Sequence, residues 1–374
     1  MNKIIITQYN GRIMTAETDE KRILDISFEE SGRVRIDDIY TGRVESIAEN
    51  IKAAFIEVAD GVKCFYQMKP DEKLKIGQEL PVQIKREAVK TKDAECDIRL
   101  SIPGKYVVVT EGIYSLGISS KIPDGPRRFE LQQLFDVEFS YDDEFSFIIR
   151  TNALEAENEV ILEEARAHME MLRALRESAS HSVPFKKLYS GSSVYSDKLR
   201  DHRGEICAVT DVREIYEDIL SSFPEIKAEF YQDEMLSLVK LYRIESAIED
   251  ALARKVWLKS GGYLVIDETE ALTVIDVNTG KNDTKGKMEE VFFKTNLEAA
   301  REAAAQLRLR NISGMIIIDF IDMKSKGHLD ELVSVLKKEL FNDPVKASFV
   351  DVTKLNLVEV TRKKMLRSLK EQLA

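Results

Sequence analysis

The first 34 residues alternate between apolar and polar positions, which is the pattern of half-buried β-strands. Ile4 and Ile6 lie on one face of a first strand, and Asn10-Gly11 after it is a strong signal for a hairpin turn. A second run of this kind surrounds Ile26. Because so few residues cannot enclose a core, we expect this segment to pack against a later part of the chain.

Residues 35–98 have a different rhythm, in which short β-like runs are separated at close intervals by turn residues such as Ala59-Asp60-Gly61. Many short strands joined by tight turns are typical of a small closed barrel. The runs are Ile39–Val44, Ala53–Val58, Lys63–Tyr66 and Glu79–Ile84.

Helical spacing follows in the middle of the chain. After β-like segments at 105–110 and 146–151, a long helix is predicted from about Glu155 to Ala179, because apolar residues recur there at helical intervals. Residues 195–251 have the pattern of a strand followed by helices. From Gly261 onward, the order hairpin, helix, strand, helix, strand predicts an α/β layer.

Two apolar strands in this last region each lead into an aspartate. Asp276 lies near the end of Leu272–Asn278, and Asp319 follows Met315–Ile318. Open α/β sheets bind ligands beyond their strand ends, and two carboxylates brought together there would offer oxygen ligands suited to Mg²⁺. An aspartate at a strand end is also commonly a turn or cap residue, so neither position is decisive alone.

Neighbouring polar residues refine this hypothesis. Asn278 lies two positions after Asp276, and alternate residues of a strand face the same side, so an amide and a carboxylate project together. Asp322 lies three positions after Asp319, so a regular strand would turn these two carboxylates to opposite faces. We therefore take Asp319 as the site residue and expect Asp322 to orient it or to contact a neighbouring backbone.

The predicted barrel carries aromatic side chains that could stack on unpaired bases. Phe55 and Phe65 fall in neighbouring strands, and a basic run from Lys85 to Lys92 follows them. Aromatic stacking combined with cationic contacts to the backbone is how such barrels hold single strands. Two simpler interpretations stay open, namely that both phenylalanines are core residues and that the basic run is a solvated face.

Composition narrows the class of protein. The 374 residues are 44% hydrophobic and 32% charged, and the net charge of −11 argues against indiscriminate nucleic-acid binding. No stretch approaches the roughly 20 apolar residues of a membrane span, and the first apolar run is too short for a signal peptide. The three cysteines form no C-x-x-C pair, so we expect neither a disulfide framework nor a thiolate zinc site, and we expect a cytoplasmic location.

Several ordered motifs together resemble the ribonuclease E/G family. A set this long is far more specific than any short motif, and the resemblance extends through the barrel and, more weakly, through the middle of the chain. The motifs are Ser260–Asn278, Thr295–Ala300, Gln306–Arg310 and Ile318–Met323.

The resemblance implies a multidomain fold of α+β and α/β type. An S1-type barrel of the OB class, at residues 35–98, would be inserted into an RNase H-like subdomain built from residues 1–34 and 195–251. A 5′-sensor region would occupy residues 99–194 and a DNase I-like catalytic subdomain residues 252–374. The split subdomain would explain why the first 34 residues look incomplete.

The resemblance also implies roles for individual residues. Asp276 and Asp319 match the family's magnesium-binding catalytic carboxylates, and Asn278 matches the amide that helps to orient the attack. In the barrel, the RNA-contacting residues correspond to Phe55, Phe65 and Lys92. The pocket for a 5′-monophosphate corresponds to Gly104, Val108, Arg150 and Thr151, with the last two supplying hydrogen bonds to the phosphate.

Two departures from the family pattern bear on partners and sensing. Family members carry a C-x-x-C element after the catalytic subdomain, where two chains share a zinc ion. This chain reaches Ala374 without such a pair, so we expect no zinc, and any homo-oligomer would not be linked by zinc. Either this branch lacks the element or the chain is a piece of a longer one. Where the family has an arginine in the sensor region, this chain has Ser120, so weaker sensing of the 5′ end is expected.

The resemblance thus implies a Mg²⁺-dependent endoribonuclease that hydrolyses single-stranded, A/U-rich RNA to 5′-phosphate and 3′-hydroxyl ends in mRNA decay and rRNA processing, stimulated by a 5′-monophosphate. One alternative is a single-stranded RNA-binding protein without turnover, which would shift labelled RNA on a gel without cutting it. A weaker alternative is a phosphoesterase acting on another substrate such as DNA, which a comparison of RNA with its deoxy counterpart would identify.

Overall fold

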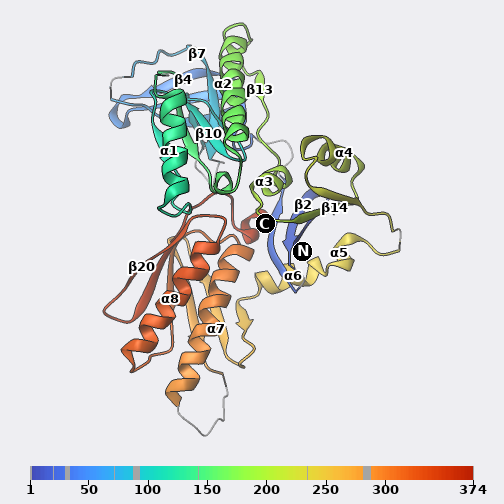
Figure 1. The fold of residues 1–374 in the computed structure, drawn as a ribbon, viewed down its shortest axis with the longest axis vertical. Coiled ribbons are helices and arrows are strands. Elements are labelled where there is room, and N and C mark those ends of the chain that lie inside the picture. The colour runs from blue at the N-terminus through green and yellow to red at the C-terminus, as the bar shows by residue number, and fades with distance from the viewer. Residues whose placement is uncertain are drawn as a thin grey trace. The chain divides into compact units, whose positions relative to one another are not determined.

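The computed structural model describes residues 2–19, 21–29, 34–70, 72–86, 93–141, 143–233, 235–280 and 288–373. The chain divides into two compact units, one formed by residues 1–29 with 205–374 and the other by residues 30–204. Figure 1 shows the strands and helices of each unit. The prediction of a mixed α and β chain with a closed barrel is confirmed by the sheets described below.

The first unit contains a five-stranded sheet that joins the N-terminal strands to two strands from beyond residue 204. Its order is β15-β14-β1-β2-β3, and β1 pairs in parallel with β14, which explains how the short N-terminal segment obtains a core. Asn10 and Gly11, with φ of 50° and 76°, form the predicted turn between β1 and β2. The strands are β1 (Asn2–Tyr9), β2 (Arg12–Thr18), β3 (Ile23–Phe28), β14 (Ile206–Thr210) and β15 (Lys227–Phe230).

Short helices accompany this sheet. Buried residues of α5, α6 and α9 join those of the strands in one hydrophobic core, and α4 contacts β14 and β15. These helices are α4 (Arg213–Ser222), α5 (Leu238–Leu241), α6 (Ile244–Leu252) and α9 (Leu369–Leu373).

A six-stranded sheet in the same unit has the order β16-β17-β18-β19-β21-β20. Two long helices, α7 (Met288–Leu309) and α8 (Lys326–Asn342), lie next to each other and bury their apolar stripes against it (Figure 1). Because α7 connects β18 to β19, these two strands run parallel. The strands are β16 (Lys255–Trp257), β17 (Tyr263–Glu268), β18 (Leu272–Asn278), β19 (Gly314–Asp319), β20 (Ala347–Val352) and β21 (Leu357–Arg362).

The second unit begins with the predicted barrel. Strands β4, β5, β6, β8 and β7 pair in succession, and a pairing between β4 and β7 closes the ring, while β13 (Lys187–Tyr189) adds to β4 from outside. The short helix η1 follows β4. The remaining bounds are β4 (Ile39–Ala48), η1 (Glu49–Ile51), β5 (Ala53–Ala59), β6 (Val62–Gln67), β7 (Glu79–Arg86) and β8 (Ala94–Asp97).

A four-stranded sheet of order β11-β12-β10-β9 follows the barrel, and buried residues of α1 and α2 share its core. The second unit ends with α3 (Val194–Asp201). The other elements are β9 (Ser101–Pro103), β10 (Val107–Glu111), β11 (Leu116–Ile118), α1 (Pro126–Phe139), β12 (Phe145–Ile149), η2 (Thr151–Leu154) and α2 (Asn158–Ser180).

The entry and exit of this second unit are tied together by one buried carboxylate. Asp38, which is fully buried near the entry, accepts hydrogen bonds from Lys187 Nζ at 2.7 Å and from the Gly191 amide at 2.9 Å near the exit. Gly191 packs so closely that a Cβ there would overlap the Ile36 carbonyl oxygen. Burial would raise the pKa of Asp38, but these and further hydrogen bonds outweigh it and hold that pKa below its ordinary value.

Among the described residues, no helix is both long enough and apolar enough to span a membrane. The cysteines at 64, 96 and 207 are free thiols, and each is buried.

Candidate active site

The ends of two parallel strands bring the two predicted aspartates together. Asp276 on β18 is the direct cross-strand partner of Asp319 on β19. Partners in register point to the same face of a sheet, so both carboxylates project side by side. This outcome follows from the helix connection, because parallel pairing with this register places equivalent strand ends next to each other.

The alternation of buried and exposed positions shows which face they occupy. Ile275 and Val277 on β18, and Ile318 on β19, are buried in the core formed with α7 and α8. Asp276 and Asp319 lie between these positions and are exposed. The carboxylate pair therefore stands on the face of the sheet opposite the helices.

Asn278 shares that face, as its spacing predicted. Its Nδ2 donates a hydrogen bond to Asp276 Oδ2 at 2.8 Å. This bond fixes the orientation of the Asp276 carboxylate and leaves the other oxygen, Oδ1, available for a ligand. The arrangement supports a positioning role for the amide.

Asp322 lies closer to the pair than strand alternation suggested. Strand β19 ends at Asp319, so the chain beyond it no longer alternates and the argument from opposite faces does not apply. Partial desolvation raises the pKa of Asp319 most, and the nearby negative charges of Asp276 and Asp322 raise it further. Asp322 Oδ1 also accepts a hydrogen bond from Asn356 Nδ2 at 3.1 Å, which holds it beside the site.

Two residues of α7 that are not among the predicted site residues hold the chain that follows Asp319. Asn296 is fully buried, donates to the Ile321 carbonyl at 2.7 Å and accepts from the Ile321 amide at 3.0 Å. Glu289 accepts hydrogen bonds from the backbone amides of Lys324 and Ser325, each at 3.0 Å. The one available signal was Asn296 itself, a polar residue within the apolar stripe of a helix.

The donor set fits a hard divalent cation held by few protein ligands. In the described ranges, no cluster of three or more His, Cys, Asp or Glu side chains is placed to hold a metal. Two exposed carboxylates stand in register, and partial desolvation together with the charge of Asp276 raises the pKa of Asp319, so a dication that relieves their repulsion fits this site. Magnesium in particular binds proteins through one or two carboxylates and keeps several waters.

The barrel places its two phenylalanines on the outside. Phe55 on β5 and Phe65 on β6 are cross-strand partners, and their ring centroids lie 6.0 Å apart in an edge-to-face arrangement. Both rings are half-buried, while the alternate residues Ile56 and Cys64 fill the core of the barrel. The interpretation of both rings as core residues is therefore wrong. Lys92 lies outside the described residues.

The start of the basic run is engaged within the protein. Lys85 Nζ donates to Gln83 Oε1 and to Ser101 Oγ, both at 2.6 Å, and burial lowers the pKa of Lys85. Arg86 forms an ion pair with Glu95 at 2.8 Å. Lys85 is therefore a structural contact of the barrel.

The four residues assigned to phosphate sensing come from neighbouring segments. Arg150 donates to the Gly104 carbonyl at 2.5 Å and forms an ion pair with Asp201 at 2.6 Å. Thr151 is within 2.9 Å of the Ser119 hydroxyl. Val108, on β10, is half-buried. Arg150 is thus held in place at one end and paired with an acid at the other.

The carboxylate of Glu164 binds backbone amides next to these four residues. Glu164 on α2 accepts hydrogen bonds from the backbone amides of three consecutive residues, Lys105 at 2.8 Å, Tyr106 at 2.8 Å and Val107 at 2.9 Å. A Cβ at Gly104 would overlap the Glu164 carboxylate and the His168 ring, so a larger residue there would have to displace these side chains. These amides are already satisfied, which leaves the side chains as the donors for any further anion.

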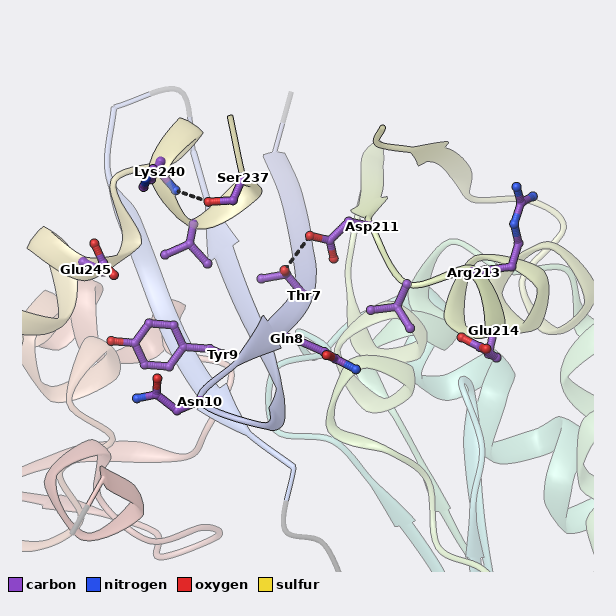
Figure 2. A pocket seen from close by; sticks show the side chains of 12 residues that line it. Thr7, Gln8, Tyr9, Asn10, Asp211, Arg213, Glu214, Ser237, Lys240 and Glu245 are labelled. Carbon is purple, nitrogen blue, oxygen red and sulfur yellow. Dashed lines mark hydrogen bonds between the residues drawn. The ribbon is translucent and has the colours of Figure 1, made fainter. Parts of the chain in front are cut away.

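The first unit also contains an open pocket of about 590 Å³, away from the carboxylate pair (Figure 2). It lies beside the end of β1 and the start of α4. Thr7 Oγ1 donates to Asp211 Oδ2 at 2.8 Å, so the acid in this pocket is already bonded to a neighbouring hydroxyl. None of the predicted site residues lines it.

Comparisons with known proteins agree with these motifs. The model of a family described as "Ribonuclease E/G family" matches residues 101–365. Ribonuclease G of Salmonella typhimurium is 32% identical over 373 residues, which covers 92% of this chain and 76% of that protein. Ribonuclease G of Haemophilus influenzae is 32% identical, covering 98% and 80%. Ribonuclease E of Haemophilus influenzae is 30% identical, covering 96% and 41%.

Proposed function

The chain belongs to the ribonuclease E/G family and is an endoribonuclease, and we propose that it cleaves single-stranded RNA with Mg²⁺ at the Asp276–Asp319 pair. The substrate would be A/U-rich, the products would carry 5′-phosphate and 3′-hydroxyl ends, and the reaction would serve RNA processing and decay in the cytoplasm. The observation that carries this proposal is the direct pairing of the two carboxylates on the exposed face of the sheet.

Each residue of the site has a defined task in this reaction. Asp276 and Asp319 would hold the cation, and Asn278 keeps the Asp276 carboxylate oriented through its 2.8 Å hydrogen bond. When bound, the cation would stabilise charge on the scissile phosphate and lower the pKa of an attacking water. Asn296 acts indirectly, because its bonds to Ile321 fix the segment that follows Asp319.

We propose the same subdomain roles that the family resemblance implies. Residues 35–98 would be an S1-type barrel that contacts RNA through Phe55, Phe65 and Lys92. The half-buried position of both phenylalanine rings on the outside of the barrel supports this role, since stacking needs an accessible ring. The five-stranded sheet would be the RNase H-like subdomain, residues 99–194 the 5′-sensor region, and residues 252–374 the DNase I-like catalytic subdomain.

We also propose that a 5′-monophosphate accelerates cleavage through Arg150 and Thr151, beside Gly104 and Val108. The Gly104 carbonyl accepts a hydrogen bond from the guanidinium of Arg150. This bond fixes the plane of the guanidinium, so its other N–H donors can point together toward a phosphate. A phosphate would have to compete with Asp201 for this guanidinium.

The test of the active site replaces each carboxylate by its neutral amide. Asp276→Asn and Asp319→Asn should each lower cleavage of labelled single-stranded RNA by at least about 100-fold, because each removes a charged ligand of the cation. RNA affinity, measured by gel shift in chelator, should stay within about threefold of wild type, since neither carboxylate attracts phosphate.

The matched control is Asp351→Asn, an exposed aspartate on the edge strand β20 of the same sheet. It should retain full activity. Wild-type activity in both site variants would refute the proposed site, and RNA binding without any Mg²⁺-dependent fragments in the wild-type protein would refute the proposed chemistry.

A further inference from the structure

An exposed aromatic corner lies at the edge of the six-stranded sheet, on strands β16 and β17. The rings of Trp257 and Tyr263 have centroids 5.3 Å apart and planes inclined by 63°. Trp257 is 65% exposed, although tryptophan is a residue that proteins usually bury to a large extent. No function assigned above uses either ring.

Strand register places this corner on the same face as the carboxylate pair. Trp257 is the cross-strand partner of Tyr263, and Tyr263 is the partner of Asn278. Asn278 in turn lies two residues from Asp276 along β18, so all of these side chains project from one face. Two strand spacings across and two residues along the strand put the Cα atoms of Trp257 and Asp276 roughly 12 Å apart. A short stretch of single-stranded RNA spans that distance.

A lysine completes the corner. Lys255 Nζ lies 3.5 Å from the centroid of the Tyr263 ring and 3.9 Å from that of Trp257. Within the described part of the chain, Lys255 forms no ion pair, whereas the adjacent Arg254 is bound by Asp267 through two hydrogen bonds of 2.6 and 2.7 Å. The two rings hold the lysine in place, and within the described residues no carboxylate neutralises its charge, so it can meet a phosphate.

This combination has the chemistry of nucleotide recognition. A base stacks on an exposed aromatic face whatever its identity, and a nearby cation neutralises the phosphate that the base brings with it. A second copy of this chain would be a poorer occupant, because an interface core excludes unpaired charge and Lys255 lies over both rings. The shared face and the short distance to the carboxylates favour the RNA strand itself.

We propose that Lys255, Trp257 and Tyr263 form a base-stacking subsite, which holds one nucleotide of single-stranded RNA beside the scissile position. The inference rests on the proposed function for the class of its ligand. In this subsite, Trp257 stacks on the base, Tyr263 supports the tryptophan ring from the side, and Lys255 contacts the neighbouring phosphate.

Trp257 provides its own probe, because it is the single tryptophan of the chain. With the intact protein in chelator, titration of a short oligouridine should change the Trp257 fluorescence saturably, and the deoxy counterpart should do so as well, because stacking reads the base. Trp257→Ala should weaken the affinity for the oligonucleotide by about 5- to 100-fold, and Trp257→Phe should keep it within about threefold. The aromatic control is Tyr141→Ala, at an exposed tyrosine of the other unit.

Lys255→Gln tests the phosphate contact separately. Its slope of log affinity against log salt concentration should be shallower than that of wild type by about 0.7, the value for one phosphate of a single strand. In cleavage assays with Mg²⁺, Trp257→Ala should raise the KM and leave the kcat within about threefold, since the residue binds substrate away from the reacting atoms.

The outcomes separate this inference from the proposed function. An unchanged Trp257 fluorescence, together with an unchanged KM for Trp257→Ala, would overturn the subsite while the metal-dependent cleavage stands. Saturable fluorescence change without any cleavage would support the subsite and overturn the nuclease proposal. A fluorescence change that follows protein concentration in the absence of RNA, with a lower solution mass for Trp257→Ala, would assign the corner to a second copy and overturn the subsite.

Discussion

At the scale of single residues, the charge of Asp319 has a cost when no cation is bound. Partial desolvation and the carboxylates of Asp276 and Asp322 raise the pKa of Asp319, so the native state holds its proton more tightly than the unfolded chain does. Ionisation of Asp319 therefore lowers native stability as the pH rises from the pKa of the unfolded chain through the higher pKa of the native state. A bound dication would reverse the effect, because it favours the ionised form of Asp319.

Asp319→Asn should consequently raise the melting temperature of the chelated protein at about pH 7 by a few degrees at most, and this gain should vanish near about pH 3, where the carboxyl is protonated. Adding Mg²⁺ at 100 times its Kd should stabilise the wild-type protein by about 2.7 kcal/mol and the variant by much less. Thermal unfolding at several pH values, with and without Mg²⁺, checks both points. Equal stabilisation of the two proteins by Mg²⁺ would contradict cation binding at Asp319.

Arg150 poses a second question at the residue scale, because Asp201 already occupies one side of its guanidinium. Asp201→Ala should increase the preference for a 5′-monophosphate over a 5′-hydroxyl substrate by up to about fivefold, the worth of a partly exposed ion pair. Arg150→Ala should abolish the preference. Competing cleavage of the two substrates measures it, and Glu144→Ala, which removes another exposed ion pair of the same unit, is the control. A preference that survives Arg150→Ala would place the sensor elsewhere.

At the scale of elements, helix α7 has two functions. It connects β18 to β19 in parallel, and its buried Asn296 holds the segment after Asp319 by two hydrogen bonds to Ile321. Asn296→Ala leaves a buried amide and carbonyl without partners, which should cost about 1–3 kcal/mol of stability. Loss of this support should also lower the kcat by about 10- to 100-fold, since catalysis is sensitive to shifts of about 1 Å.

Gln306→Ala on the same helix is the matched control for Asn296→Ala. Gln306 is also a buried amide, but it bonds Glu302 and Arg310, away from the strand ends. Its loss should destabilise the fold, measured by urea unfolding, without lowering the kcat. Equal loss of kcat in both variants would show that Asn296 acts only through general stability.

The elements also show how far sequence reasoning reaches. Local signals identified the Asn10-Gly11 turn, the rhythm of the barrel and the strands leading to Asp276 and Asp319, because each depends on nearby residues. The spacing of Asn278 from Asp276 likewise predicted their shared face. The contact of Lys85 with Ser101 and the hydrogen bonds from three backbone amides to Glu164 join segments that are separated in the chain. No local pattern encodes such contacts.

At the scale of the whole molecule, residues 30–204 form a continuous insertion between β3 and β14. Because Asp38 joins the entry of the insertion to its exit, a fragment of residues 34–204 should fold alone with native circular dichroism and a cooperative thermal transition. Asp38→Ala should abolish or strongly weaken that transition, because it leaves the Gly191 amide and Lys187 without this partner. A fragment that stays unfolded although Asp38 is present would contradict independent folding.

The tie at Asp38 has a consequence for the history of such chains. The first and last segments of this insertion are already bonded to each other. The insertion therefore adds little entropic cost of loop closure to the sheet that carries it, however many residues it contains. For the surrounding sheet, 175 inserted residues (30–204) then behave much like a short turn. An insertion built in this way can be gained, lost or exchanged in one genetic event. Neither the insertion nor the unit that carries it then has to change its hydrophobic core.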